Sequence, residues 1–415
     1  MTGPLQGARI AILVQNLPVP FDRRVWQEAT TLAVAGADVT VVSPDAPDYP
    51  AGEFTIDGVR VHRYVNPPEA SGVFGYLREY VGALARMRRA LRGAREQSGP
   101  FDAIHFCNPP DLLYLAATPL RRRDGSKLVF DQHDLGPELV KAKAMPLSAL
   151  FVAIARYFER ATYRSADHVV ATNESYRSIA LGRGRKSPGE VTVVRSGPSR
   201  EWPDAPFVRR DWHANRQYLI GYLGVMGRQE GIEYLLEAHR LLLSQGLDVQ
   251  LSLIGSGPDR ARLEGLASGL GIADHVAFHG RVSDEVLKSI LSDADVCVNP
   301  DEVNPMNDQS TMNKIIEYMA LGRPIVQFDV REGRFSAQEA SLYAAANDAA
   351  SFADRIADVL RDHRLAARMG AFGGMRFREV LAWEQQGERL VRMYERLLST
   401  RGRPRSDRSA DTIGQ

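Results

Sequence analysis

Hydrophobic residues recur along the chain as short aliphatic runs, each followed by a turn and a longer stretch with helical spacing. In the first half the runs are RIAILVQN, DVTVVSP, FDAIHFCN, SKLVFDQHD, ADHVVATN and EVTVVRSG. Short continuous runs of this kind predict strands buried on both faces, and their alternation with helices predicts a mostly parallel sheet. The pattern restarts at YLIGYLGVMG and continues through VQLSLIGSG, HVAFHG, DVCVNP and PIVQFDV. The sequence therefore predicts two doubly wound, Rossmann-like α/β domains in tandem.

The boundaries follow from where each pattern stops. We expect an N-terminal domain over residues 1–198, a polar linker over 199–216, a C-terminal domain over 217–382, a terminal helix over 383–400 and a disordered tail over 401–415. Doubly wound sheets bind ligands at the carboxyl ends of their strands, so we expect an active site in a cleft between the domains, with the terminal helix packing back across it.

Composition narrows the class of protein. The 52 Lys and Arg residues nearly balance the 51 Asp and Glu residues, which gives no reason to expect a nucleic-acid partner. Cys107 and Cys297 each lie in a predicted buried strand, which favours reduced thiols and a cytoplasmic protein over a disulfide or metal site. The apolar run near the N-terminus is too short for a signal sequence or a membrane span.

One segment carries the most specific pattern, STMNKIIEYMALGRPIVQFD. Ser310 and Thr311 are candidate caps of a helix whose first turn holds Asn313 and Lys314. Free amides at such a helix start, with a lysine beside them, suit a phosphate group. Glu317 begins an otherwise apolar stretch, so its carboxylate requires either solvent or hydroxyl donors such as those of a ribose.

The chain resembles the family 4 retaining glycosyltransferases, in which two glutamates lie seven residues apart and the second stands in a phrase like EYMALGRPIV. The stretches LVQNLPVPFDRRVWQEATTLAVAGADVTVVSP, FDQHDLGPEL, VVRSGP, LIGSGP and FHGRVSDEVL agree with that family in order. The resemblance implies the GT-B fold, an acceptor in the N-terminal domain and a nucleotide diphosphate sugar as donor in the C-terminal domain. It implies no further cofactor and no metal.

The resemblance also implies roles for individual residues. In the donor domain, Glu317 would bind the ribose, the start of its helix would hold the diphosphate, and two loops would surround the base. The remaining donor residues are Ser310, Thr311, Met312 and Asn313 for the diphosphate, and Gly255, Gly257, Arg281 and Val282 around the base. His133, with Asp134, follows a predicted strand and would lie nearest the reacting sugar; we expect Phe21, Asp22, Arg23 and Asn108 to shape the acceptor site.

Three positions depart from the family pattern. Gln309 stands where the earlier glutamate belongs, and Val225 and Glu230 stand where the family has a phosphate-binding arginine and lysine. A departing nucleoside diphosphate needs positive charge nearby, and we assign that work to Arg228 and Lys314.

A predicted helix over residues 76–97 carries six arginines against two glutamates. Its basic and apolar residues at helical spacing fit either an anionic membrane surface or an ordinary solvated helix face.

The sequence thus predicts a metal-independent retaining glycosyltransferase that moves a sugar to a sugar or lipid-linked acceptor, in assembly of a surface polysaccharide or glycolipid. No HExxH, paired CxxC or Walker loop is present, and no GxGxxG with a distal acidic partner. A sugar-nucleotide epimerase of the same fold and a nucleotide-sugar-binding subunit without turnover remain as alternatives.

Overall fold

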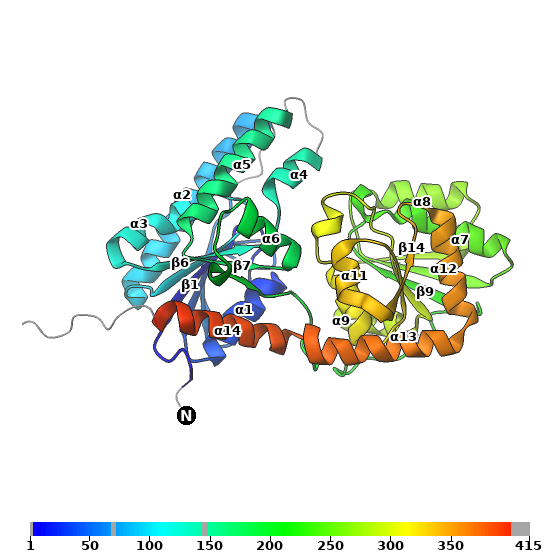
Figure 1. Ribbon diagram of the computed structural model, residues 1–415. Coiled ribbons are helices and arrows are strands. Elements are labelled where there is room, and N and C mark those ends of the chain that lie inside the picture. Colours follow the sequence, from blue (N-terminus) through cyan, green and yellow to red (C-terminus); the bar gives the residue numbers. More distant parts are fainter. Residues whose placement is uncertain (1–2, 68–71, 143–147, 400–415) are drawn as a thin grey trace, which may run out of the picture. The chain divides into compact units, whose positions relative to one another are not determined.

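The protein is described by a computed structural model that covers residues 3–67, 72–142 and 148–399 (Figure 1). It divides into two compact units. The first comprises Met1–Val194 together with the chain from Gly387 onward, and the second comprises Arg195–Gln386. The segment 401–415, predicted to be a disordered tail, lies outside the described residues.

The first unit contains an eight-stranded sheet in the order β3-β4-β2-β1-β5-β6-β7-β8. All neighbouring strands are parallel except β3 and β4, which form an antiparallel hairpin. The strands are β1 Arg9–Leu13, β2 Asp38–Pro44, β3 Gly52–Ile56, β4 Val59–Tyr64, β5 Ala103–Cys107, β6 Lys127–Gln132, β7 His168–Ala171 and β8 Val191–Val193.

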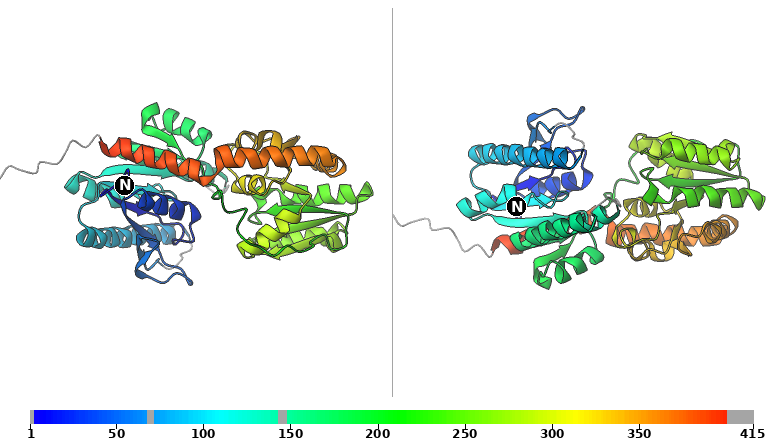
Figure 2. Two further views of the ribbon diagram at one scale, coloured as in Figure 1. Left: turned by 90° about the horizontal axis from the view of Figure 1, so that it is seen from below. Right: turned by 90° about the horizontal axis from the view of Figure 1, so that it is seen from above.

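Helices lie on both faces of this sheet (Figure 2). They are α1 Arg23–Val34, α2 Gly72–Ser98, α3 Tyr114–Asp124, α4 Gly136–Ala142, α5 Ser148–Ser165 and α6 Glu174–Gly182, and most of α14 Trp383–Ser399 belongs to the same unit. Tyr394 of α14 is fully buried there. The first unit is therefore built from both ends of the chain.

The second unit contains a six-stranded, wholly parallel sheet in the order β11-β10-β9-β12-β13-β14. Its strands are β9 Tyr218–Leu223, β10 Val249–Ile254, β11 Val276–Gly280, β12 Val296–Asn299, β13 Ile325–Phe328 and β14 Ser341–Ala344. The helices are α7 Ile232–Ser244, α8 Arg260–Gly269, α9 Asp284–Asp293, α10 Asn313–Ala320, α11 Arg331–Ala337, α12 Ala349–Arg361 and α13 His363–Arg376.

Two doubly wound α/β units are the predicted fold class, which the structure confirms. Each predicted aliphatic run forms a strand. Strands β5, β10 and β12 are buried along their whole length, and β1 is buried after Arg9, because helices cover both faces. Cys107 on β5 and Cys297 on β12 are buried free thiols, as expected.

The structure adds strands that the pattern did not predict. β3 is exposed along most of its length, so its sequence shows no apolar run, and it is joined to β4 by a turn at Asp57 and Gly58 with positive φ. β14 is a four-residue edge strand.

The segment 199–216, predicted as a linker, packs onto the second unit. The Trp212 backbone N–H donates to Asp293 at 2.8 Å, and its indole N–H donates to the Ser289 hydroxyl at 2.9 Å. Trp202 packs against the same apolar cluster. The two tryptophans thus give a polar segment an apolar anchor.

Gly231 is required where the loop after β9 meets the end of β12. A Cβ added there would lie 2.0 Å from the Pro300 carbonyl oxygen, at φ +62°. We predict that Gly231→Ala lowers the free energy of unfolding by more than about 2 kcal/mol, measured by urea denaturation. Gly246→Ala is the matched control, because Gly246 has φ +81° but no atom within 4 Å of the added Cβ, so only the φ cost of about 1 kcal/mol applies. Equal losses would show that the close approach is unimportant.

Candidate functional site

The predicted residues of the first unit gather at the carboxyl ends of β5 and β6. Asn108 follows β5, and its side-chain oxygen accepts hydrogen bonds from the backbone N–H groups of His133 and Asp134 at 2.8 and 3.2 Å. Its amide nitrogen donates to Asp111 and to the Asp134 carbonyl. Asn108, predicted to contact the acceptor, is buried and uses its amide to hold the loop that carries His133.

His133 presents one ring nitrogen outward. Its Nε2 contacts the Asp131 carboxylate and lies 3.2 Å from Arg24 Nε, whereas Nδ1 has no hydrogen-bond partner within residues 3–67, 72–142 and 148–399. The side chain is 17% exposed, so Nδ1 is the atom available to a ligand. Burial alone would lower the pKa of His133, but the charge of Asp131 outweighs it and raises that pKa.

Behind His133 lies a buried ion pair. Arg24 on α1 donates two hydrogen bonds to Asp131, at 3.1 and 2.7 Å, and a third to the Val194 carbonyl at 2.9 Å. Glu28, one turn along α1, lies 3.0 Å from Arg24 and is fully buried. Burial opposes ionisation of Asp131, but Arg24 and His133 hold its pKa well below the usual value. Burial and the Asp131 charge raise the pKa of Glu28 to about 7.

Helix α14 reaches this cluster through Tyr394. The Tyr394 hydroxyl lies 2.8 Å from Nδ1 of His105 on β5, and Nε2 of His105 lies 3.4 Å from Glu28 and 3.5 Å from Asp131. Sequence reasoning did not identify this network. The available signal was polar residues inside otherwise apolar strands, in FDAIHFCN and SKLVFDQHD.

The loop before α1 supplies the remaining predicted acceptor residues. Asp22 accepts a hydrogen bond from the Val25 backbone N–H and so caps α1. Phe21 is 40% exposed and lies beside the ring of Tyr49, and Arg23 is exposed. Of the acceptor residues predicted in this loop, Phe21 and Arg23 are the two with exposed side chains.

In the second unit, glycines allow two loops to lie directly against each other. A Cβ on Gly255 would lie 1.9 Å from the Gly224 carbonyl oxygen, and one on Gly257 would lie 2.4 Å from that of Met226. Both predicted base-site glycines thus join the loop after β10 to the loop after β9. Arg281 and Val282 follow β11; Arg281 is exposed, and Val282 packs partly into the apolar core.

Helix α10 begins at Asn313 with Met312 as its N-cap, and no side chain caps it. The predicted capping by Ser310 and Thr311 is wrong, because the Ser310 hydroxyl donates to the Met306 carbonyl and Thr311 lies 3.4 Å from the Arg195 guanidinium. The first-turn amides of α10 therefore lack a side-chain acceptor. Every other residue of the helix is buried, which leaves only Asn313 and Glu317, one turn apart, with exposed surface.

Lys314 is held between two carboxylates. Its Nζ lies 2.7 Å from Glu230 and 2.9 Å from Asp301, and 4.9 Å above the Tyr222 ring. Burial raises the pKa of Asp301 to about 7, despite the opposing effect of Lys314. Arg228 is exposed and makes no ion pair with a residue the structure describes. Of the two cations assigned to the diphosphate, Lys314 pairs with two carboxylates, whereas Arg228 has no carboxylate partner among the described residues.

Gln309 lines a cavity of about 540 Å³ formed with Val303, Asn304, Pro305, Asp308 and Arg331. Its side-chain amide donates to the Pro305 carbonyl at 2.7 Å. Gln309, which stands where the family pattern has its earlier glutamate, therefore borders a cavity at the same sheet edge as the start of α10.

Two groups within the described part of the chain bring potential metal ligands together. His105, Cys107 and Asp131 form one, but Arg24 pairs with Asp131 there and would repel a cation. Asp211, His213 and Asp293 form the other, in which Nδ1 of His213 lies 3.3 Å from Asp211 and 3.2 Å from Asp293.

Both units match family models of one class. The model described as "Glycosyl transferases group 1" matches residues 217–362, and the model described as "Glycosyl transferase 4-like domain" matches residues 22–197. The chain belongs to the group 1 glycosyltransferases. The family resemblance expected from the motifs is thus confirmed.

Two curated relatives illustrate the range of similarity to this glycosyltransferase. Alpha-D-kanosaminyltransferase of Streptomyces kanamyceticus is 27% identical over 183 residues, which is 43% of this chain and 46% of that protein. The match spans less than half of that relative. Phosphatidyl-myo-inositol mannosyltransferase of Mycobacterium leprae is 25% identical over 384 residues, 92% of this chain and 94% of that protein.

Solved structures share the fold across both units. Sucrose-phosphate synthase from Thermosynechococcus elongatus has a TM-score of 0.78 at 22% identity, covering 95% of this chain and 100% of that one. Anabaena Alr3699/HepE in complex with UDP and glucose has a TM-score of 0.68 at 14% identity, covering 93% and 98%. These likenesses establish the GT-B fold. Within the described residues, the glycosyltransferase has no helix long and apolar enough to span a bilayer.

The raised pKa of Glu28 makes stability depend on pH. Between the ordinary value of 4.5 and about 7, the folded state retains a proton that the unfolded chain has released, so folding stability falls as pH rises. We predict that Glu28→Gln removes this pH-dependent loss of stability. The free energy of unfolding of the variant, relative to wild type, therefore increases as pH rises from 4.5 to about 7. Urea denaturation on either side of it measures the change. Glu96→Gln, an exposed position on α2, should show no such trend.

Proposed function

We propose that this glycosyltransferase is a retaining enzyme that binds a nucleotide diphosphate sugar on its second unit and a sugar or lipid-linked acceptor on its first, without a metal. The observation that carries the proposal is the exposed edge of α10, where Glu317 lies one turn beyond uncapped amides. Two hydroxyls of a ribose suit the carboxylate, and a diphosphate suits the amides. The structures of Anabaena Alr3699/HepE in complex with UDP and glucose and with UDP-glucose support a nucleotide donor.

Positive charge for the leaving diphosphate would come from Lys314 and Arg228. The family lysine position holds Glu230, yet the Lys314 ammonium lies 2.7 Å from that carboxylate. A cation is therefore present near the same place, supplied by α10 instead of the loop. Arg228, two residues before Glu230, is exposed and able to add a second charge.

The transfer needs no protein nucleophile. The bond from the anomeric carbon to the phosphate oxygen breaks as the bond to the acceptor oxygen forms on the same face, and the acceptor's hydroxyl proton passes to the leaving phosphate. His133, with Nδ1 outward and Nε2 fixed by Asp131, would orient the sugar or acceptor. The comparisons do not favour an epimerase or a silent subunit.

We further propose a cytoplasmic enzyme that works at a membrane surface in glycolipid or surface polysaccharide assembly. Two buried free thiols suit a reducing compartment. On the described part of α2, Arg88, Arg89 and Arg92 are exposed, with Val81 59% exposed on the same helix. The name of the mycobacterial phosphatidyl-myo-inositol mannosyltransferase supports a lipid acceptor.

The donor site is tested by calorimetry with UDP-, GDP- and dTDP-sugars in EDTA, with products followed by mass spectrometry. We expect one donor to bind and to be slowly hydrolysed, and Glu317→Ala to weaken binding by about tenfold or more. Glu339→Ala removes an exposed carboxylate elsewhere in the second unit and serves as control. Unchanged binding by Glu317→Ala would contradict the donor site, and a requirement for added metal would contradict metal independence.

The buried network predicts a positioning role for Tyr394. Tyr394→Phe keeps the buried ring but removes the hydroxyl that holds His105, so we expect kcat to fall roughly three- to tenfold with donor affinity unchanged. His133→Ala should lower kcat further, again without loss of donor binding. Tyr176→Phe, which removes another buried hydroxyl of the first unit, is the control. A parallel fall in donor affinity would point to a structural role instead.

A further inference from the structure

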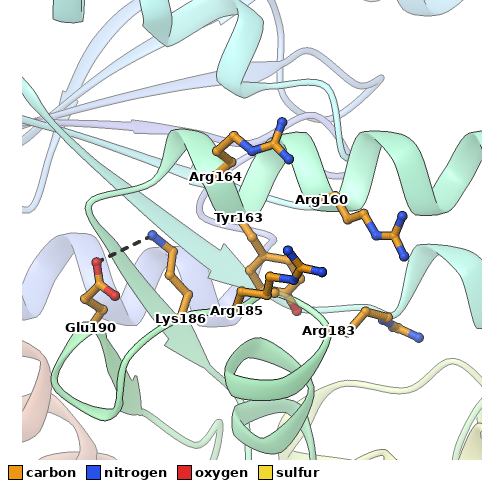
Figure 3. A pocket seen from close by; sticks show the side chains of 8 residues that line it. Arg160, Tyr163, Arg164, Arg183, Arg185, Lys186 and Glu190 are labelled. Atoms are coloured by element: carbon orange, nitrogen blue, oxygen red, sulfur yellow. Dashed lines mark ion pairs between the residues drawn. The ribbon is translucent and has the colours of Figure 1, made fainter.

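The first unit contains a basic pocket at the amino ends of β7 and β8, the sheet edge opposite His133. Its volume is about 420 Å³, within the range of small-molecule sites. Arg160, Tyr163 and Arg164 line it from α5, and Arg183, Gly184, Arg185, Lys186 and Glu190 line it from the segment between α6 and β8. Figure 3 shows the basic side chains around the Tyr163 ring. Five cations face one carboxylate.

Two of these cations already form ion pairs or hydrogen bonds with the protein. Arg183 lies 2.7 Å from Glu138 and 2.6 Å from the buried Glu159. Lys186 donates to the Ala166 carbonyl at 2.5 Å and lies 3.8 Å from Glu190 (Figure 3). Burial lowers the pKa of Lys186, because its charge is poorly solvated. An anion in the pocket would therefore stabilise a charge that the protein only partly compensates.

The other three cations have no partner among the residues that the structure describes. Arg160, Arg164 and Arg185 are exposed, and none forms a hydrogen bond or ion pair with residues in the described ranges. The chain as a whole has a net charge of only +1, so this concentration of like charge is local. Guanidinium groups from a helix and a loop line one pocket, and each planar group can donate two hydrogen bonds to phosphate oxygens.

The loop that presents Arg185 is fixed in place. A Cβ on Gly184 would lie 2.5 Å from the Ala180 carbonyl oxygen and 2.8 Å from the Tyr163 ring, so only glycine allows this approach. The backbone N–H groups of Gly184 and Lys186 bond to the end of α6 at 3.0 Å each. Arg185 itself adopts a left-handed conformation at φ +55°, which glycine adopts more readily. A charged side chain is thus present where the backbone alone would favour glycine.

We propose that this pocket binds a phosphate-bearing ligand, at a site separate from the donor and acceptor sites. The ligand is either a soluble phosphate compound or the headgroup of an anionic phospholipid. The second source is relevant because Leu150, Ile154 and Tyr157 are 55%, 43% and 69% exposed on α5, spaced three or four residues apart and leading toward Arg160.

The probe for the soluble source is inorganic pyrophosphate, and hydrogen–deuterium exchange locates where it binds. We expect pyrophosphate to protect the backbone amides of residues 183–190 in the full-length protein. The triple variant Arg160→Ala, Arg164→Ala and Arg185→Ala should lose this protection and require about tenfold or more pyrophosphate for any that remains. Protection confined to the second unit would reflect the donor site alone and would overturn the proposal.

Two further variants separate a site from general electrostatics and from misfolding. Arg185→Gly removes one guanidinium while relieving the positive φ, so it should weaken binding with no loss of thermal stability. Arg88→Ala, Arg89→Ala and Arg92→Ala together remove the same charge from α2 and should leave protection of residues 183–190 intact. Equal weakening by the α5 and α2 triple variants would overturn a specific site.

The probe for the lipid source is sedimentation with vesicles of equal parts phosphatidylcholine and phosphatidylglycerol, compared with phosphatidylcholine alone. The test uses the Arg88→Ala, Arg89→Ala and Arg92→Ala variant as background, so that these α2 arginines make no contribution. If the pocket binds a headgroup, this background sediments only with the anionic vesicles and loses that sedimentation when Arg160, Arg164 and Arg185 are also replaced by Ala. If the added substitutions leave sedimentation unchanged but remove pyrophosphate protection, the ligand is a soluble phosphate compound. If replacing Arg160, Arg164 and Arg185 removes neither sedimentation nor pyrophosphate protection, the proposal is overturned.

Discussion

The buried ion pair between Arg24 and Asp131 is the interaction on which the first unit's site depends. Both partners are buried, so loss of one would leave the other with only Glu28 or His133 to compensate its charge, which is destabilising. The same guanidinium binds the Val194 carbonyl at the end of the unit, and the same carboxylate contacts His133. One pair therefore fixes α1, the end of β6 and the chain beyond β8 with respect to one another.

A similar constraint orders the second unit, although its charges are arranged differently from the family pattern. Lys314 compensates Glu230 and Asp301, which would otherwise be two carboxylates at an edge suited to a diphosphate. One ammonium group thus lies between two carboxylates, which keeps like charges from facing each other at the start of α10.

The sequence predicted both sheets because strands covered on two faces must be apolar. It predicted the end of the sheet at which the site residues lie, because parallel strands have their carboxyl ends on the same side. It did not predict β3, whose residues are exposed, or the capping of α10, which depends on how Ser310 turns back to Met306. The network behind His133 also escaped prediction. Its members come from α1, β5, β6 and α14, and only the folded structure shows that these segments meet.

The participation of α14 has a consequence for how the protein is made. The first unit is discontinuous in sequence, since residues up to 194 are completed by helix residues from Gly387 onward. During synthesis the second unit must emerge from the ribosome before Tyr394 exists to cover His105. The N-terminal half therefore lacks its α14 contacts until the whole second unit has been translated.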